Sequence, residues 1–257
     1  MAQLDRIGIG TYKLLDDTCI DIVSLALQMG YRTIDTATRY RNHTQVARGI
    51  SRSGINRSEI FLTSKIHDSA QKQNRVAAEI DQILHDLCVD KIDMLLLHAP
   101  IESKISQSWR VLEEARQAGK VQHIGVSNFE ICDLRQLAFA PYVNQFEIHP
   151  LNTRCKLVNY CHDNGILIQA YASLTHGIRL NDPQILDACA DRKPANVLLK
   201  WAMQKDYYVI PKTANYEHLV ENWSVPKTTD LSDDMIKKLD GLNEQYYTIG
   251  RYKRFDY

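Results

Sequence analysis

Residues 92–98 read IDMLLLH, an apolar run of strand length that ends in an ionisable residue. IFLTSK at residues 60–65 and YRTID at residues 31–35 have the same form. If these runs are parallel strands of one closed barrel, their last side chains gather at one rim, and such barrels carry out chemistry at that rim. The three runs therefore predict a barrel with a reactive rim.

Longer segments of helical period separate the apolar runs. The clearest helices are expected at residues 16–29, 75–87, 104–118 and 196–204, with a last one after Ser232. Alternation of strand and helix, repeated about eight times in one chain of this length, is the pattern of a (β/α)8 (TIM) barrel. We predict an α/β fold of this kind as a single domain over residues 1–257. The eight strands are expected near residues 7–11, 31–36, 60–65, 92–98, 121–126, 143–148, 166–171 and 207–211.

An open doubly wound sheet is the competing fold. It would usually carry a glycine-rich nucleotide-binding turn after the first strand. Residues 8–13 read GIGTYK, which lacks the last glycine of a GxGxxG motif. The barrel is therefore the better interpretation.

Composition excludes several classes of protein. The 257 residues are 44% apolar and 24% charged, with a formal net charge of zero, which argues against a general binder of nucleic acid or acidic membranes. No segment is apolar over a bilayer-spanning length, and residues 1–15 lack a signal-peptide pattern. The six cysteines form no CxxC pair and the nine histidines no HExxH motif. We expect a cytoplasmic protein with reduced thiols and no metal site.

The last residues of the three opening runs suit the reduction of a carbonyl group. Tyr40, five residues past Asp35, can donate a proton to a carbonyl oxygen, but a phenol titrates near pH ~10. A neighbouring cation lowers that pKa, and Lys65 is the candidate. Asp35 would hold Lys65, and a neutral His98 would orient the substrate oxygen. Each of these four residues, taken alone, also fits an ordinary structural role.

Several motifs occur in the order found in aldo-keto reductases. They are GYRTIDTA at 30–37 with Tyr40, Ser64-Lys65, Leu97-His98, HIGVSNF at 123–129, NQFEIHP at 144–150, and IPK at 210–212 followed by Glu221-Asn222. The chain resembles this family over nearly its full length. Its compact layout resembles the short, bacterial diketogluconate reductases more than the mammalian steroid enzymes.

The resemblance implies a barrel that binds NAD(P)H without a Rossmann motif. It implies Tyr40 as proton donor, Lys65 and Asp35 as the residues that tune it, and His98 as the orienter of the carbonyl. It also implies a monomer with a small-molecule carbonyl substrate. Ser127, Asn128 and Gln145 would hold the nicotinamide carboxamide, Tyr171 would stack on the ring, Lys212 and Thr213 would meet the 2′-phosphate, Glu221 and Asn222 would lie near the adenine, and Thr11 and Leu174 would complete the cofactor contacts.

The chain departs from the family at the cofactor phosphates. His218 stands where an arginine often grips the 2′-phosphate, and a neutral imidazole lacks the fixed charge of a guanidinium. We expect NADPH to be preferred, with NADH possible. Ala172 stands where the family often has a serine directly after the tyrosine, here Tyr171, in the segment ASL at 172–174. The short segment THG at 175–177 predicts no long clamp over the cofactor.

The expected substrate pocket is polar, and it is formed by Tyr12, Arg39, His67 and Ala99. Arg39 and His67 either point to solvent or point inward, and inward they would select small polar or anionic carbonyl compounds. The aromatic and basic end of the chain, residues 246–257, either folds over the rim or packs on the barrel.

Two other functions stay open. One is an aldolase-like barrel in which Lys65 forms a Schiff base with the substrate. The other is a cofactor-binding regulatory or redox-sensing barrel with low turnover. The presence of all four rim residues favours the reductase.

Overall fold

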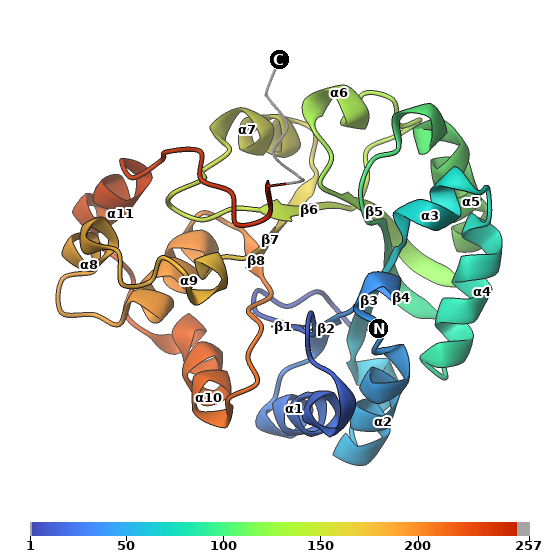
Figure 1. Cartoon of the computed structure of the whole chain (residues 1–257), viewed down its shortest axis with the longest axis horizontal. Helices are drawn as coiled ribbons and strands as arrows, with labels where there is room; N and C mark the ends of the chain where they lie inside the picture. Colours follow the sequence, from blue (N-terminus) through green and yellow to red (C-terminus); the bar gives the residue numbers. More distant parts are fainter. Residues whose placement is uncertain (1, 251–257) are drawn as a thin grey trace.

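The computed structural model describes residues 2–250. Within them, eight parallel strands form one sheet in the order β1 to β8, so each strand pairs with its neighbours in sequence (Figure 1). The predicted (β/α)8 barrel is confirmed, and each strand lies inside or within a residue of its predicted run. The strands are β1 (Ile9–Gly10), β2 (Thr33–Asp35), β3 (Phe61–Ile66), β4 (Ile92–Leu97), β5 (Val121–Ser127), β6 (Val143–Glu147), β7 (Leu167–Tyr171) and β8 (Tyr208–Val209).

The barrel closes between its first and last strands. Ile7 forms a parallel bridge with Val209, the Gly8 N–H donates to the Val209 carbonyl at 2.8 Å, and the Val209 N–H donates to Arg6 at 2.9 Å. A Cβ at Gly10 would lie 2.8 Å from the carbonyl oxygen of Ile210, so this seam requires a glycine. Closure removes the two exposed edges that an open sheet would leave.

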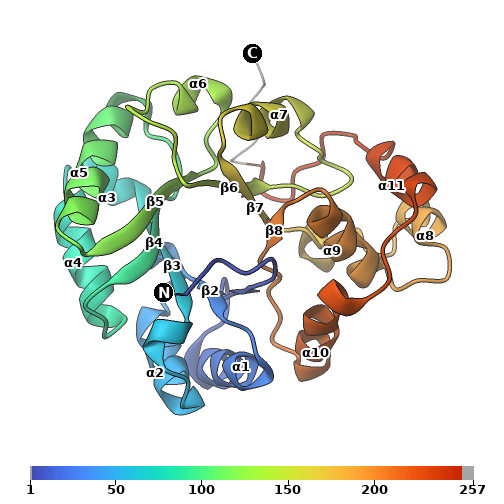
Figure 2. The ribbon, with the colours of Figure 1, turned by 180° about the vertical axis from the view of Figure 1, so that it is seen from behind.

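Helices surround the sheet on its outer side (Figures 1 and 2). The α-helices are α1 (Asp16–Met29), α2 (His43–Ser53), α3 (Asp68–Lys72), α4 (Val76–Asp86), α5 (Ile105–Gln117), α6 (Ile131–Leu134), α7 (Cys155–Asp163), α8 (Pro183–Cys189), α9 (Pro194–Gln204), α10 (Tyr216–Ser224) and α11 (Asp233–Asp240). Short 3₁₀ turns lie in the connections, among them η1 (Thr38–Tyr40) and η4 (Thr175–Gly177).

Helix α1 has the predicted bounds, and its sequence explains both ends. Asp16 and Asp17 lie in the first turn, where carboxylates complement the helix dipole. Gly30 follows the last turn with φ of 119° and donates its N–H to Ala26 and Leu27. Gly30 therefore provides the left-handed C-cap that ends the helix and turns the chain into β2.

One small apolar cluster is separate from the main core between sheet and helices. Phe61, Met94, Leu96 and Val143 form it, and Ala2 and Leu4 pack against it. Phe61 and Val143 are the first residues of their strands, so this cluster fills the amino-terminal part of the barrel. The polar residues considered below come from the opposite, carboxyl ends of the strands.

None of the helices in the described part of the chain combines the length and the apolar character that crossing a bilayer requires.

Candidate active site

Asp35, Lys65 and Tyr40 meet at the carboxyl ends of β2 and β3. The Lys65 Nζ lies 2.5 Å from Oδ1 of Asp35 and 3.1 Å from the Tyr40 hydroxyl, and it also donates to the Thr36 carbonyl at 3.1 Å. Asp35 and Lys65 are almost completely buried, at 1% and 0% exposure, whereas Tyr40 is half-buried. A phenol that contacts a buried ammonium on one side and the surface on the other can exchange a proton with a bound ligand.

The loop that carries Tyr40 is fixed by a buried asparagine. Asn42 donates to the carbonyls of Thr11 and Leu14, each at 2.9 Å, and accepts from the Thr36 hydroxyl at 2.8 Å. It thereby ties the β2 end to the loop after β1. Tyr40 is the last residue of the turn η1. The hydrogen bonds of Asn42 fix the loop on both sides of this turn and so keep Tyr40 at the rim.

The charge of Lys65 depends on Asp35. Burial lowers the pKa of Lys65, and the negative charge of Asp35 and the hydrogen bond to it oppose this effect. An amine this buried would otherwise favour its neutral form. Asp35 therefore keeps a positive charge beside the Tyr40 hydroxyl.

Two further rings border Tyr40. The His98 ring follows β4 and lies edge-on to Tyr40, with ring centroids 5.9 Å apart at 85°. The Tyr12 ring lies on another side of Tyr40 at 5.1 Å, and the His176 ring follows at 6.4 Å from Tyr12. Burial lowers the pKa of His176, which favours a neutral imidazole. His98 and Tyr12 thus border the phenol, and His176 lies behind Tyr12.

A buried amide pair extends inward from Asp35. The Gln145 Nε2 donates to Oδ2 of Asp35 at 2.8 Å and to Oε1 of Gln169 at 2.6 Å. Sequence reasoning missed Gln169, which is fully buried. The signal that could have found it is its spacing, because alternate strand residues share a face and Gln169 is two residues before Tyr171.

The other residues expected near the carboxamide of the cofactor form one hydrogen-bonded group. The Asn128 side-chain amide donates to the His98 carbonyl at 2.9 Å and to the Ser127 hydroxyl at 3.0 Å. The Tyr171 hydroxyl donates to Oδ1 of Asn128 at 2.7 Å, and the Ser127 hydroxyl donates to the Gln145 carbonyl at 2.9 Å. Strands β5, β6 and β7 bring these side chains together.

The residues expected near the adenosine follow β8. Burial lowers the pKa of Lys212, and the positive charge of the neighbouring Lys13 lowers it further. Two ammonium groups therefore lie near each other here. Thr213 exchanges hydrogen bonds with the backbone of Asn215, while the side chain of His218 is exposed. The described residues therefore offer positive charge here, but without an arginine.

Four other expected cofactor residues have partners or are packed into the fold. Glu221 forms an ion pair with Lys193 at the surface, and Asn222 is buried in α10. Leu174 packs against the main core, so its side chain contributes packing. Thr11 is buried and its hydroxyl donates to the Asp35 carbonyl at 3.0 Å, which links β1 to β2 at the rim.

The four residues expected to line a substrate pocket differ in their contacts. The Arg39 guanidinium pairs with Asp68 at 2.5 Å, so its charge is already balanced. The His67 Nδ1 accepts from the Ser69 N–H at 3.0 Å and caps α3. Ala99 is buried, and the Tyr12 ring packs against the Tyr40 ring with centroids 5.1 Å apart.

A carboxylate at the end of β6 anchors the C-terminal segment. Glu147 accepts 2.7 Å hydrogen bonds from both the N–H and the hydroxyl of Thr248, and a 3.4 Å bond from the N–H of Ile249. The buried His149 lies 3.1 Å away. Sequence reasoning did not single out Glu147. This part of the tail therefore attaches to the rim, and residues 251–257 lie outside the described residues (Figure 1).

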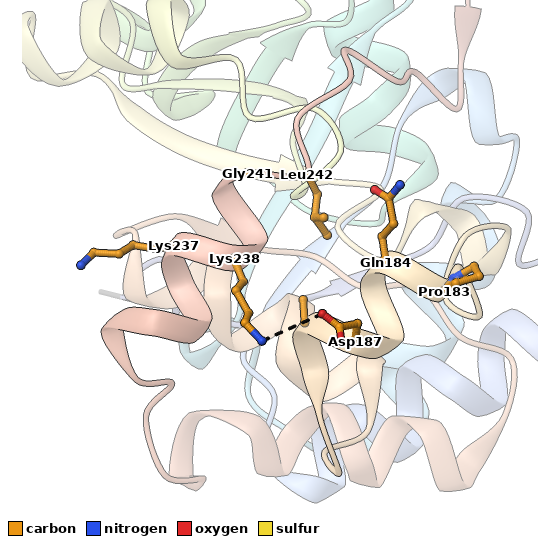
Figure 3. Close-up of a pocket in the computed structure, with 8 residues that line it drawn as sticks. Pro183, Gln184, Asp187, Lys237, Lys238, Gly241 and Leu242 are labelled. Carbon is orange, nitrogen blue, oxygen red and sulfur yellow. Dashed lines mark ion pairs between the residues drawn. The ribbon is translucent and has the colours of Figure 1, made fainter.

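A surface groove of 490 Å³ lies elsewhere, between α8 and α11 (Figure 3). Asp187 and Lys238 face each other across it at 3.9 Å. None of the rim residues lines it, and its position among the outer helices separates it from the strand ends. In residues 2–250, no group of three or more His, Cys, Asp or Glu is arranged to bind a metal ion.

The rim fits a nicotinamide cofactor by its chemistry. The Gln145 Nε2 makes both hydrogen bonds of this side chain to the described residues. Its Oε1 accepts none from them and is not sealed inside the protein, so it can accept a hydrogen bond from an amide. The Lys13 and Lys212 side chains supply charge for phosphates. The half-buried Tyr171 supplies an aromatic ring for stacking.

Comparisons with known proteins identify the family of the chain. The sequence profile of the "Aldo/keto reductase family" matches residues 6–244. The chain is 35% identical to the glyoxal reductase of Bacillus subtilis (94% of this chain, 90% of that protein) and 33% identical to the glycerol 2-dehydrogenase (NADP(+)) of Saccharomyces cerevisiae (95% and 89%). The crystal structure of MGS-M4, an aldo-keto reductase from a Medee basin deep-sea metagenome library, superimposes with a TM-score of 0.92 at 30% identity, covering 99% of this chain and 97% of that one. The chain belongs to the aldo/keto reductase family.

Proposed function

We propose that the protein reduces small, polar aldehydes and ketones to alcohols, with NADPH as the preferred cofactor. The observation that carries the proposal is the 3.1 Å hydrogen bond from Lys65 to the Tyr40 hydroxyl, next to the buried Asp35. Relatives named as a glyoxal reductase and an NADP(+)-dependent glycerol dehydrogenase act on compounds of this size and polarity.

When bound, NADPH supplies a hydride to the carbonyl carbon. Tyr40 donates its hydroxyl proton to the carbonyl oxygen as negative charge develops there. Lys65 stabilises the phenolate that results, because an adjacent cation favours the charged form of a phenol. Asp35 keeps Lys65 charged and in place, and the imidazole of His98 donates an N–H to the same oxygen and aims it at Tyr40.

The residues that would hold the cofactor come from β5, β6 and β7, the loops at the rim, and the loop and helix after β8. Ser127, Asn128 and Gln145 would bind the carboxamide, and the Tyr171 ring would stack on the nicotinamide. Lys212, Thr213 and His218 would meet the 2′-phosphate, Glu221 and Asn222 would lie near the adenine, and Thr11 and Leu174 would complete the cofactor contacts.

The substrate meets Tyr12, Arg39, His67 and Ala99. The pairing of Arg39 with Asp68 favours neutral polar carbonyl compounds over anionic ones, because the positive charge is already balanced. The whole chain acts as one domain and as a monomer in the cytoplasm.

Cofactor fluorescence titration with NADPH and NADH, followed by a panel of carbonyl compounds, tests the proposal. We expect NADPH to bind more tightly than NADH, and small polar aldehydes to be turned over faster than bulky lipophilic ketones. A higher kcat/KM with NADH would reject the cofactor preference. Tight binding of NADPH without turnover of any carbonyl compound would favour a regulatory barrel instead.

A Schiff-base aldolase is the second candidate, because burial lowers the pKa of Lys65 as such an enzyme requires. The contacts of Lys65 with Asp35 and Tyr40 oppose it, since they hold the amine charged. Borohydride reduction in the presence of a carbonyl substrate separates the two. Covalent labelling of Lys65 would favour the aldolase, and its absence alongside NADPH oxidation would favour the reductase.

A further inference from the structure

The side-chain oxygen of Gln169 accepts a hydrogen bond from Gln145 Nε2 at 2.6 Å. Its own Nε2 is buried and has no hydrogen-bond partner among the described residues. A buried N–H without a partner costs free energy, and an aliphatic side chain of similar length would avoid that cost. The feature of Gln169 that offsets this cost is therefore its acceptor oxygen.

This oxygen completes the environment of the Gln145 amide. One hydrogen of Gln145 Nε2 goes to Asp35 and the other to Gln169. A carboxylate and an amide oxygen are both acceptors, so the nitrogen of Gln145 must face inward. Gln145 then has Oε1 as the polar atom that it can offer to a ligand.

The side chains of Asn128 and Ser127 have also used their donors. Both hydrogens of the Asn128 amide are donated, to the His98 carbonyl and the Ser127 hydroxyl. The hydroxyl hydrogen of Ser127 goes to the Gln145 carbonyl. This corner of the rim therefore presents acceptor lone pairs, and a ligand that fits it must bring N–H groups.

We propose that Gln169 is a positioning residue that makes the site select for the amino group of the nicotinamide carboxamide. It acts through Gln145, whose oxygen it keeps turned toward the ligand. The proposal rests on the function proposed above, because it names how the same site recognises its cofactor.

The test compares dissociation constants of three oxidised cofactors, measured by quenching of protein fluorescence. They are NADP⁺, its thionicotinamide analogue, which keeps the amino group, and its 3-acetylpyridine analogue, which replaces the amino group with a methyl group. For the unmodified protein we expect the acetylpyridine analogue to bind about tenfold more weakly than NADP⁺ and the thionicotinamide analogue within about threefold, the scale of one or two hydrogen bonds.

Two variants of Gln169 form a matched pair. In Gln169→Met, one N–H of Gln145 loses its acceptor and can turn toward the ligand, so the penalty of the acetylpyridine analogue should fall to about twofold. Gln169→Glu keeps an acceptor oxygen at the same reach, and the penalty should remain. Gln169→Leu, with the same expectation, replaces the methionine variant if the latter does not fold.

The outcomes are distinct. A uniform rise of all three dissociation constants in Gln169→Met indicates a merely structural role and overturns the proposal. Equal behaviour of Gln169→Glu and Gln169→Met overturns it as well. An acetylpyridine analogue that binds the unmodified protein as tightly as NADP⁺ overturns it without any variant. Absence of NADP⁺ binding would instead overturn the proposed function, and this proposal with it.

Discussion

The Lys65 ammonium lies 2.5 Å from a carboxylate oxygen of Asp35, and the two side chains are only 1% and 2% exposed. Removing one partner leaves an uncompensated charge in the barrel. We expect Asp35→Asn and Lys65→Met each to lower the free energy of unfolding by about 3–5 kcal/mol. Urea denaturation at pH 7 measures this loss.

The double variant Asp35→Asn/Lys65→Met is the control for that prediction. It removes both charges, so its loss of stability should be smaller than the sum of the two single losses by about 2 kcal/mol or more. Additive losses would mean that the two charges do not stabilise each other, and the charge assigned to Lys65 beside Tyr40 would lose its support.

Tyr40→Phe removes the hydroxyl that accepts the Lys65 hydrogen bond and keeps the ring that packs against Tyr12 and His98. We expect kcat/KM for carbonyl reduction to fall by about 10²–10⁴-fold, the usual contribution of a positioned acid. The dissociation constant for NADPH, measured by fluorescence titration, should stay within about twofold, because the variant loses only the group that donates a proton to the carbonyl oxygen of the substrate. Full activity in Tyr40→Phe would reject Tyr40 as the proton donor.

The strands could be predicted from the sequence because each is a short apolar run between segments of helical period. Helix α2 was not among the helices expected, since its sequence HTQVARGISRS is mostly polar and its buried face carries only two large apolar side chains, Val46 and Ile50. Helix α7 was missed too, and it starts after Arg154 in a left-handed conformation that no sequence rule assigns to arginine.

The rim residues could be predicted because parallel strands align their carboxyl ends, and this fixes Asp35 beside Lys65 whatever the loops do. Gln169 could not, because a neutral amide inside a strand gives no chemical signal until its partner is known. Glu147 and Thr248 are 101 residues apart, and their contact depends on the path of the tail rather than on any local pattern.

The Glu147 carboxylate should make stability depend on pH. Burial raises its pKa, but the hydrogen bonds from His149 and Thr248 outweigh this, and the net pKa is lowered from its ordinary value of 4.5. The stabilisation is therefore present above about pH 4.5 and is lost as the pH falls through the folded-state pKa. Glu147→Gln should lower the free energy of unfolding by about 1–3 kcal/mol at pH 7, and by less below pH ~4.

A second tail carboxylate provides the control. Glu244 pairs with Arg179 but is 46% exposed, so Glu244→Gln should change stability by less than about 1 kcal/mol at either pH. Urea denaturation of both variants at the two pH values measures the difference. A Glu147→Gln variant that loses as much stability at pH 4 as at pH 7 would show that the charge of Glu147 does not anchor Thr248.

His218→Arg tests the cofactor preference. The exposed side chain of His218 lies one turn into α10, and a guanidinium there could bind a phosphate through two hydrogen bonds. We expect the dissociation constant for NADPH to fall about tenfold and that for NADH to stay unchanged. His218→Lys should give a smaller gain, since an ammonium lacks the fork. Equal gains for NADPH and NADH would place residue 218 away from the 2′-phosphate.

Asp68→Asn tests the polarity of the substrate pocket. The Asp68 carboxylate balances the Arg39 guanidinium at 2.5 Å, and Arg39 directly precedes Tyr40 in η1. Removing the carboxylate leaves a net positive charge next to the proton donor. We expect kcat/KM for a small keto acid, divided by that for a neutral aldehyde of the same size, to rise by about three- to tenfold. Steady-state kinetics at low ionic strength measure this ratio.

The rise in this ratio of kcat/KM values should depend on ionic strength and on whether the Arg39–Asp68 pair is kept. Added salt screens the exposed part of the charge, so the ratio in Asp68→Asn should fall toward that of the unmodified protein as ionic strength rises. Asp68→Glu keeps the carboxylate within reach of Arg39 and should leave the ratio unchanged. An unchanged ratio in Asp68→Asn would mean that Arg39 does not face the substrate, and Tyr12 would then be the pocket residue left to explain a preference for polar carbonyl compounds.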